Sequence, residues 1–254
     1  MYEELVDKIA AAGVGKYALL QKSKGRYFIL AMLAGMYVGF GILLIFSVGA
    51  PLADSPLRKT LMGVSFGIAL SLVVMAGSEL FTGNNLVLTV TSLERKVSWL
   101  GTAKLWGWSY LGNLAGSVLL AAIFVLSGSA RGPVGEFFIQ TSQAKMAGGF
   151  LDLFFKGVLC NILVCLAVLS SIKLKEETAK LIMIFWCLFA FITAGFEHSI
   201  ANMTILAVGL LAPHGGTLSL YGFFANLVPV TLGNMVGGAV FVGLAYWLVG
   251  RKAA

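Results

Sequence analysis

Two polar stretches interrupt otherwise apolar parts of the chain and carry its most unusual ionisable side chains. Residues 77–84 have the sequence GSELFTGN, and residues 195–202 have the sequence GFEHSIAN. Both follow the pattern G-x-E-x-x-x-x-N, which puts Glu79, Glu197 and His198 between apolar runs. Ionisable groups are costly in apolar surroundings, so they mark either a functional site or a structural hydrogen-bond network.

These side chains differ in the chemistry that is open to them. Glu79 and Glu197 could accept hydrogen bonds from backbone N–H groups that are freed where a helix breaks, and we favour this structural role for both. His198 could donate a hydrogen bond to a passing anion or exchange a proton with it, the alternative being a satisfied core histidine. Thr82 could present a hydroxyl opposite His198, or simply cap the following helix. If these stretches lie at the centre of a membrane, the N-termini of helices that begin there would add partial positive charge, which also favours anions.

No pattern in the sequence predicts catalysis. A P-loop, a cluster with metal-ligand spacing and a Ser/His/Asp set are all absent from it. The three cysteines lie inside apolar segments and are interpreted as small buried side chains. We therefore expect neither an enzyme nor a bound cofactor or metal ion.

The composition indicates where the polar stretches must lie. Hydrophobic residues make up 59% of the 254 residues and charged residues 11%, and the mean hydropathy is +0.92. A soluble domain has about 25% charged residues, so an integral membrane protein is predicted. Six apolar segments reach or approach the ~20 residues that cross a bilayer: 27–50, 60–76, 105–128, 148–171, 181–194 and 222–249. The second and fifth are short, and apolar runs at 86–93 and 203–212 would complete each crossing as a broken helix.

A second motif indicates that the chain is a tandem duplication. Leu-Gly-Asn ends at Asn113 and again at Asn234, and a glycine follows three residues later in both places. Asn234 follows Asn113 by 121 residues, and Glu197 follows Glu79 by 118. Each half holds three spans, so the two halves must enter the membrane from opposite sides. The predicted fold is one all-α transmembrane channel domain over 1–254, with an amphipathic helix at 1–25 and two inverted three-helix repeats, with broken second and fifth helices, at 26–128 and 146–250.

The basic residues set the predicted orientation. With successive loops on alternate sides, most of the 18 basic residues fall on the side of the two termini. The positive-inside rule then puts both termini in the cytoplasm. We expect a multi-pass protein of the cell membrane that is surrounded by the lipid bilayer. Topology accounts for the net charge of +7, so nucleic acid is not an expected partner. Lys145 lies on the opposite side, where it could concentrate anions at a pore mouth or be an ordinary interfacial lysine.

Four segments carry a resemblance to a known family: GSELFTGNN (77–85), CNILVCLAV (160–168), GFEHSIANM (195–203) and VTLGNMVGG (230–238). They closely resemble the formate/nitrite transporter family, and the similarity spans essentially the whole chain. The resemblance implies homopentamers of aquaporin-like protomers, each with one pore for formate, nitrite, hydrosulfide and related small anions. Gly83 directly after Thr82, together with the segment from Leu153 to Ala167, looks closest to the nitrite branch of the family.

Matched position by position, the resemblance implies roles for several side chains. The family's central pore histidine falls on His198, its loop threonine on Thr82 and its vestibule lysine on Lys145. Its buried asparagines fall on Asn161 and Asn202. The resemblance also implies two hydrophobic constrictions that resist bare anions, formed by Phe66, Leu70, Val164 and Phe191. Each of these side chains could instead belong simply to the core.

The implied mechanism leaves several alternatives open. Lys145 would attract the anion, and a low-dielectric pore would either raise its proton affinity or let His198 hydrogen-bond to it in passing. Whether a proton accompanies the anion is undecided at this point. A formate or hydrosulfide channel would use the same residues as a nitrite channel, because all three permeants are small, monovalent and weakly acidic. An aquaglyceroporin-like channel for neutral solutes is the alternative from another class, although the paired N-P-A motifs expected of it are absent.

Overall fold

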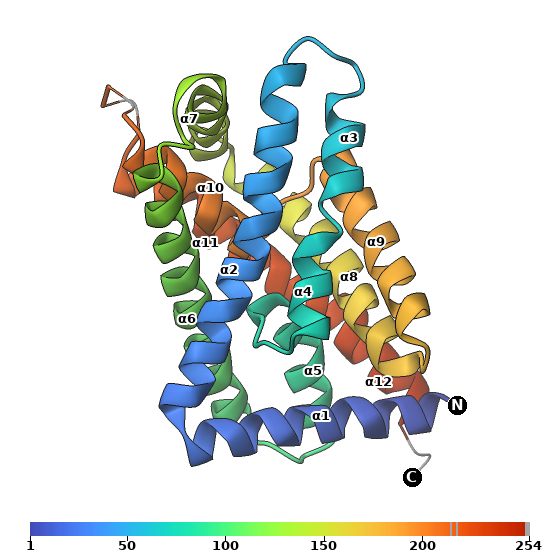
Figure 1. The fold of residues 1–254 in the computed structure, drawn as a ribbon. Helices are drawn as coiled ribbons and strands as arrows, with labels where there is room; N and C mark the ends of the chain where they lie inside the picture. Colours follow the sequence, from blue (N-terminus) through green and yellow to red (C-terminus); the bar gives the residue numbers. More distant parts are fainter. Residues whose placement is uncertain (214, 217, 252–254) are drawn as a thin grey trace.

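The computed structural model describes residues 1–213, 215–216 and 218–251, and the regular elements in this part of the chain are all helical. Six helical segments there are long and apolar enough to cross a membrane. They are Lys24–Leu52, Arg58–Met75, Trp99–Leu126 (α6), Phe150–Lys173 (α8), Glu177–Ala194 (α9) and Leu220–Gly250. The predictions of an all-α fold and of six spans are thus confirmed, and Figure 1 shows the spans packed as a bundle.

Three of these spans consist of more than one helical element. The first joins α2 to a short 3₁₀ turn, the second joins α3 to α4, and the sixth passes from α11 through a π-helical stretch into α12. Their bounds are Lys24–Gly49 (α2), Ala50–Leu52 (η1), Arg58–Ser65 (α3), Ile68–Met75 (α4), Leu220–Val236 (α11), Gly237–Leu244 (η2) and Ala245–Gly250 (α12).

Two shorter helices, α5 (Phe81–Leu93) and α10 (Ser199–Leu211), lie inside the bundle and are almost wholly buried. α5 lies in the half nearer the two termini, and α10 lies in the opposite half (Figure 1). A few non-helical residues separate α4 from α5 and α9 from α10. Gly77 and Gly195 adopt φ angles of 74° and 75° in these segments, a left-handed conformation that a residue without a Cβ atom adopts readily. The two glycines thus let the chain turn into the interior at the two polar stretches.

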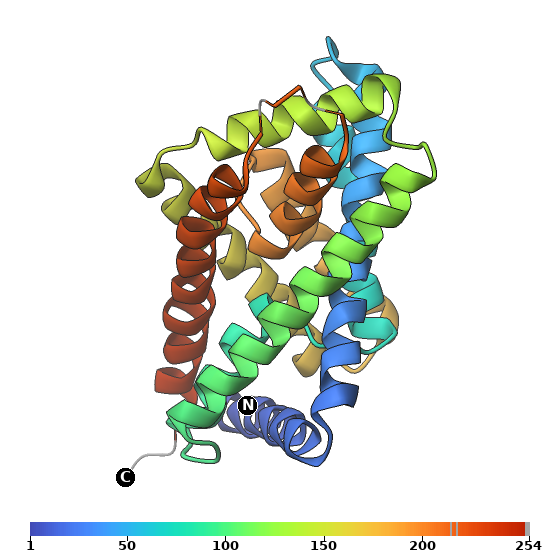
Figure 2. The same cartoon turned by 90° about the vertical axis from the view of Figure 1, so that its left-hand side faces the viewer.

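One further helix lies across each end of the bundle. α1 (Tyr2–Lys22) lies at the end that holds both termini, and α7 (Gly132–Met146) crosses the opposite end (Figures 1 and 2). We call these ends the terminus side and the far side. α1 buries Leu5, Val6 and Ile9 in a cluster with apolar side chains of α5, α8 and η2. α7 was not predicted from the sequence, because its polar side chains and its place between two spans are typical of a loop.

Close packing of α2 against α6 depends on Gly116. A Cβ atom at this position would overlap the main-chain carbonyl group of Met32, which can give way only if the two helices separate. We therefore expect Gly116→Ala to lower the free energy of unfolding by about 1–3 kcal/mol. Gly107→Ala is the matched control, because a Cβ atom at this position of α6 meets open space. Thermal unfolding in detergent measures both variants, and equal midpoints for the two would contradict the expectation.

Candidate functional site

The polar stretch on the far side is organised around Glu197. Lys145 Nζ lies 2.8 and 2.7 Å from the two carboxylate oxygens, and Asn202 Nδ2 donates to Oε2 at 2.6 Å. The side chains of Lys145 and Glu197 are only 15% and 10% exposed. The main-chain N–H of Glu197 donates to the carbonyl of Lys156 at 3.2 Å. The charge of Glu197 is therefore matched by partners within the protein, as a buried charge requires.

Asn226 extends this network to α7. Asn202 Nδ2 also lies 2.8 Å from Asn226 Oδ1, and Asn226 Nδ2 donates to the main-chain carbonyl of Lys145 at 3.0 Å. This bond holds the last turn of α7 and thereby places the Lys145 side chain against Glu197. Asn226 was not predicted as a site residue, although an amide side chain within the sixth apolar segment is a signal that could have pointed to it.

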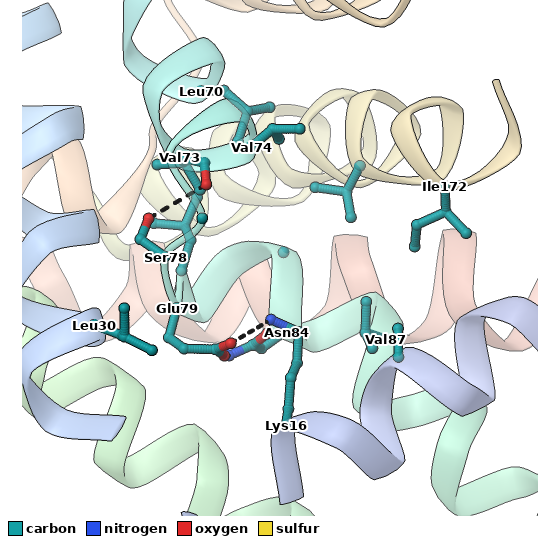
Figure 3. Close-up of a pocket in the computed structure, with 15 residues that line it drawn as sticks. Lys16, Leu30, Leu70, Val73, Val74, Ser78, Glu79, Asn84, Val87 and Ile172 are labelled. Atoms are coloured by element: carbon teal, nitrogen blue, oxygen red, sulfur yellow. Dashed lines mark hydrogen bonds and ion pairs between the residues drawn. The ribbon is translucent and has the colours of Figure 1, made fainter. Parts of the chain in front are cut away.

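The polar stretch on the terminus side has the same plan. Lys16 Nζ, from α1, lies 2.8 Å from Glu79 Oε1, and both the Tyr27 hydroxyl and Asn84 Nδ2 donate to Oε2 at 3.1 Å. Figure 3 shows Lys16 reaching from α1 towards Glu79 and Asn84. Lys16 was not predicted as a site residue, because no sequence spacing links the first helix to a residue 63 positions later.

Two asparagines of the repeated Leu-Gly-Asn motif tie down the starts of the interior helices. Asn113 Nδ2 donates to the carbonyl groups of Ala31 and Glu79 at 2.7 and 2.9 Å, and its Oδ1 accepts from Phe81 N–H at 2.9 Å. Asn234 makes the corresponding bonds in the other half, to Gly157 O at 2.8 Å, Glu197 O at 2.9 Å and Ser199 N–H at 2.9 Å. The bonds to the main-chain groups at the starts of α5 and α10 satisfy groups that have no partner within those helices. The bonds to Ala31 O and Gly157 O join these starts to the middle of α2 and of α8.

Thr82 and His198 meet where the two interior helices begin. Thr82 Oγ1 and His198 Nε2 lie 3.0 Å apart, although 116 residues separate them in the chain. His198 Nδ1 accepts a hydrogen bond from Ala201 N–H at 3.1 Å and so caps α10. Nδ1 therefore carries no proton, and the ring proton lies on Nε2, which donates to the Thr82 hydroxyl. An acceptor that came close could replace the Thr82 hydroxyl as the hydrogen-bond partner of this N–H group.

A small void of about 10 Å³ lies beside His198, and its other walls are apolar. A single water molecule needs roughly 10–15 Å³, so this part of the protein is tightly closed. The rings of Phe66 and Phe191 meet edge to face with centroids 5.7 Å apart, and Phe191 also stacks on the His198 ring at 6.0 Å. Leu70 and Val164 line the same void, so all four residues expected at the constrictions are placed around it.

Each side of the bundle also has a larger cavity. The terminus-side vestibule, of about 420 Å³, contains the Lys16–Glu79 pair among its walls. The far vestibule, of about 290 Å³, contains the Lys145–Glu197 pair. Each vestibule thus holds one Lys–Glu ion pair.

Asn161 lies behind Thr82 rather than in the wall of a vestibule. Its Nδ2 lies 3.2 Å from the Thr82 carbonyl, 3.1 Å from Asn85 Oδ1 and 2.6 Å from the Asn234 carbonyl. These contacts fix the first turn of α5 against α8 and α11. Asn202, in contrast, lines the far vestibule.

The three spaces lie in series. Leu70 lines both the terminus-side vestibule and the small void, whereas Phe191 and His198 line both the void and the far vestibule. Within the described residues, no group of three His, Cys, Asp or Glu side chains could hold a metal ion. A helical membrane bundle with two vestibules that each hold an ion pair, and an apolar centre between them, is the arrangement of a channel or transporter for small solutes.

Comparison with known proteins identifies the family. A family model described as formate/nitrite transporter matches residues 3–248, and the chain belongs to this family. The nitrite transporter NirC of Escherichia coli (strain K12) is 42% identical, with 100% of this chain and 94% of NirC covered. The solved structure of an FNT family ion channel is 41% identical, with a TM-score of 0.93 and coverage of 97% of this chain and 98% of that one. A pentameric formate channel with formate bound is 34% identical, with a TM-score of 0.82 and coverage of 91% and 99%.

These matches bear directly on two of the predictions. The resemblance based on four short segments is confirmed over nearly the whole chain. The matched proteins are transporters and channels, so the protein is a transport protein and not an enzyme.

Proposed function

We propose that the protein is a membrane channel for small monovalent weak-acid anions and that nitrite is its main permeant. The observation that carries this proposal is the position of the His198 Nε2–H donor beside an apolar void between two vestibules. Apolar walls resist bare ions, whereas one neutral donor assists an acceptor that is losing its water. The 42% identity to a protein named nitrite transporter supports nitrite over the other permeants.

The two lysines that pair with glutamates, Lys16 and Lys145, would attract the anion without holding it tightly. Lys145 is paired with Glu197, and Lys16 with Glu79, so each glutamate offsets part of the field of its lysine. Conduction requires binding that is favourable enough for entry and weak enough for exit. A lysine with a permanent carboxylate partner meets both requirements.

Passage through the centre would depend on a neutral His198. A low dielectric raises the affinity of a weak-acid anion for a proton, because burial disfavours the charged form. His198 Nδ1 already accepts the Ala201 N–H, so a second proton on the ring would break that bond. We therefore infer that Nε2–H acts as a hydrogen-bond donor and that any accompanying proton comes from vestibule water.

Formate and hydrosulfide are the alternative permeants within the same family. Formate is favoured by the similarity to a formate channel with its ligand bound, at 34% identity. A channel for neutral solutes such as glycerol is the alternative from another class, and the lysine in each vestibule disfavours it.

We also propose the finer architecture and its setting in the membrane. Residues 26–128 and 146–250 would be inverted repeats with broken second and fifth helices, and the corresponding bonds of Asn113 and Asn234 support this. Five chains would assemble around a central axis, as in the pentameric formate channel. The basic residues favour a cytoplasmic terminus side, in the cell membrane, with the far vestibule open to the outside.

Flux into proteoliposomes tests the proposal. Purified protein is compared with empty liposomes for nitrite, formate, hydrosulfide, chloride and glycerol, each at two pH values. We expect uptake of the weak-acid anions, with nitrite fastest and with little chloride or glycerol. A preference for formate or hydrosulfide would change the permeant within the family. Glycerol flux without any anion flux would overturn the anion-channel proposal.

A further inference from the structure

The two vestibules differ in charge. The far vestibule is lined by Arg58 and Lys59 from the first turn of α3, in addition to the Lys145–Glu197 pair. The terminus-side vestibule, shown in Figure 3, has Lys16 and Glu79 as its charged lining residues. The far vestibule therefore carries two cationic side chains in excess of its carboxylate, while the charges of the other vestibule balance.

Arg58 is held in place without a counter-ion. Its guanidinium carbon lies 3.7 Å from the centroid of the Phe137 ring of α7, a cation–π contact that fixes the position of the group. No carboxylate in the described part of the chain forms an ion pair with it, and Glu197 already bonds to Lys145 and Asn202. Arg58 Nε is buried and has no hydrogen-bond partner. A guanidinium N–H group without an acceptor is unfavourable, and a bound anion would satisfy it.

The other half of the chain has carboxylates at the equivalent positions. Glu176 and Glu177 follow Arg58 and Lys59 by 118 residues, which is also the separation of Glu79 and Glu197. Both glutamates are exposed. Arg58 and Lys59 therefore have no cationic counterparts at the equivalent positions of the second half of the chain.

We propose that Arg58, stacked on Phe137, is an anion-binding site that recruits planar anions with two oxygen atoms into the far vestibule. The guanidinium group presents parallel N–H donors whose spacing matches two oxygens of one anion, as found in nitrite and in carboxylates such as formate. Hydrosulfide and chloride have a single acceptor atom and gain only from the charge. The site lies in the same vestibule as Lys145 and His198, and this inference rests on the proposed anion-channel function.

Three variants separate the geometry of the group from its charge. Arg58→Gln removes both the charge and the parallel N–H donors of the guanidinium group. Arg58→Lys keeps the charge but removes the parallel donors. Arg131→Gln is the matched control, because Arg131 is an exposed cation of the same end that does not line the vestibule. Size-exclusion chromatography first establishes that each variant assembles as the unchanged protein does.

Flux and binding are then measured in parallel. For Arg58→Gln we expect the half-saturating concentration of nitrite and of formate to rise about tenfold, with maximal flux changed less than about twofold. Arg58→Lys should show the same loss for nitrite and formate but retain the half-saturating concentration of hydrosulfide. Arg131→Gln should change each value by less than about twofold. Equal effects of Arg58→Gln and Arg131→Gln, or equal effects of Arg58→Lys on nitrite and on hydrosulfide, would overturn the proposed site.

Calorimetric titration of the detergent-solubilised protein with sodium nitrite distinguishes failure of the site from failure of the proposed function. If the unchanged protein carries no anion in liposomes, the channel proposal fails. Nitrite binding that is lost in Arg58→Gln and kept in Arg131→Gln still supports the site. Nitrite binding that is unaffected by Arg58→Gln, or absent from the unchanged protein, overturns it.

Discussion

Replacing Glu197 by alanine is expected to lower the free energy of unfolding by about 3–5 kcal/mol and to reduce the yield of assembled protein. The substitution leaves the Lys145 ammonium group without a partner at a site where its side chain is only 15% exposed. Asn202 Nδ2 also loses the carboxylate acceptor that lies 2.6 Å away. The thermal unfolding midpoint and the size-exclusion profile of the purified protein measure the effect.

Two further variants test whether the uncompensated charge is the cause. Lys145→Met combined with Glu197→Gln removes both charges, so this double variant should recover most of the lost stability. Glu79→Ala should cost less than Glu197→Ala, because the Lys16 side chain is 23% exposed and can turn towards water. Unchanged stability of Glu197→Ala would contradict the structural role of the carboxylate. Failure of the double variant to recover would show that the charge balance is not the cause.

Local sequence features were sufficient to predict the spans and the position of the polar stretches. A bilayer demands about 20 apolar residues for each crossing, so the apolar runs along the chain locate the six segments. Glycines within a polar interruption, such as Gly77 and Gly195, indicate a break in the helix because few other residues adopt their backbone conformation. These properties depend on neighbours in the chain and are visible without a fold.

The partners of the polar residues could not be predicted in the same way. Lys16 reaches Glu79 only because α1 folds back across the end of the bundle, and Asn226 meets Asn202 only because α10 packs inside it. α7 itself is too polar to be recognised as an element that carries Lys145 to the vestibule. The repeated Leu-Gly-Asn motif could be recognised from sequence, but its role required knowing which backbone groups the helix ends leave free.

Replacing His198 by phenylalanine is expected to reduce nitrite flux about tenfold or more at neutral pH while leaving the oligomer intact. The substitution removes the Nε2–H donor beside the apolar void and the cap on Ala201 N–H, which contributes roughly 1 kcal/mol to stability. Without the donor, only the protonated neutral acid should cross the apolar centre. The flux of the variant should therefore fall more steeply with rising pH than that of the unchanged protein, as measured in proteoliposomes.

His198→Asn separates the two roles of the ring, because asparagine can cap α10 through Oδ1 and donate through Nδ2 but has no titratable group. If His198 acts as a neutral donor, His198→Asn should keep most of the flux and the pH profile of the unchanged protein, and only His198→Phe should lose them. If the ring instead exchanges protons with the anion, both variants should lose the same pH dependence, and the neutral-donor mechanism would be wrong. Unchanged flux of His198→Phe across the pH range would remove the histidine from the pathway altogether, since its Nε2–H is the polar donor at the void between the two vestibules.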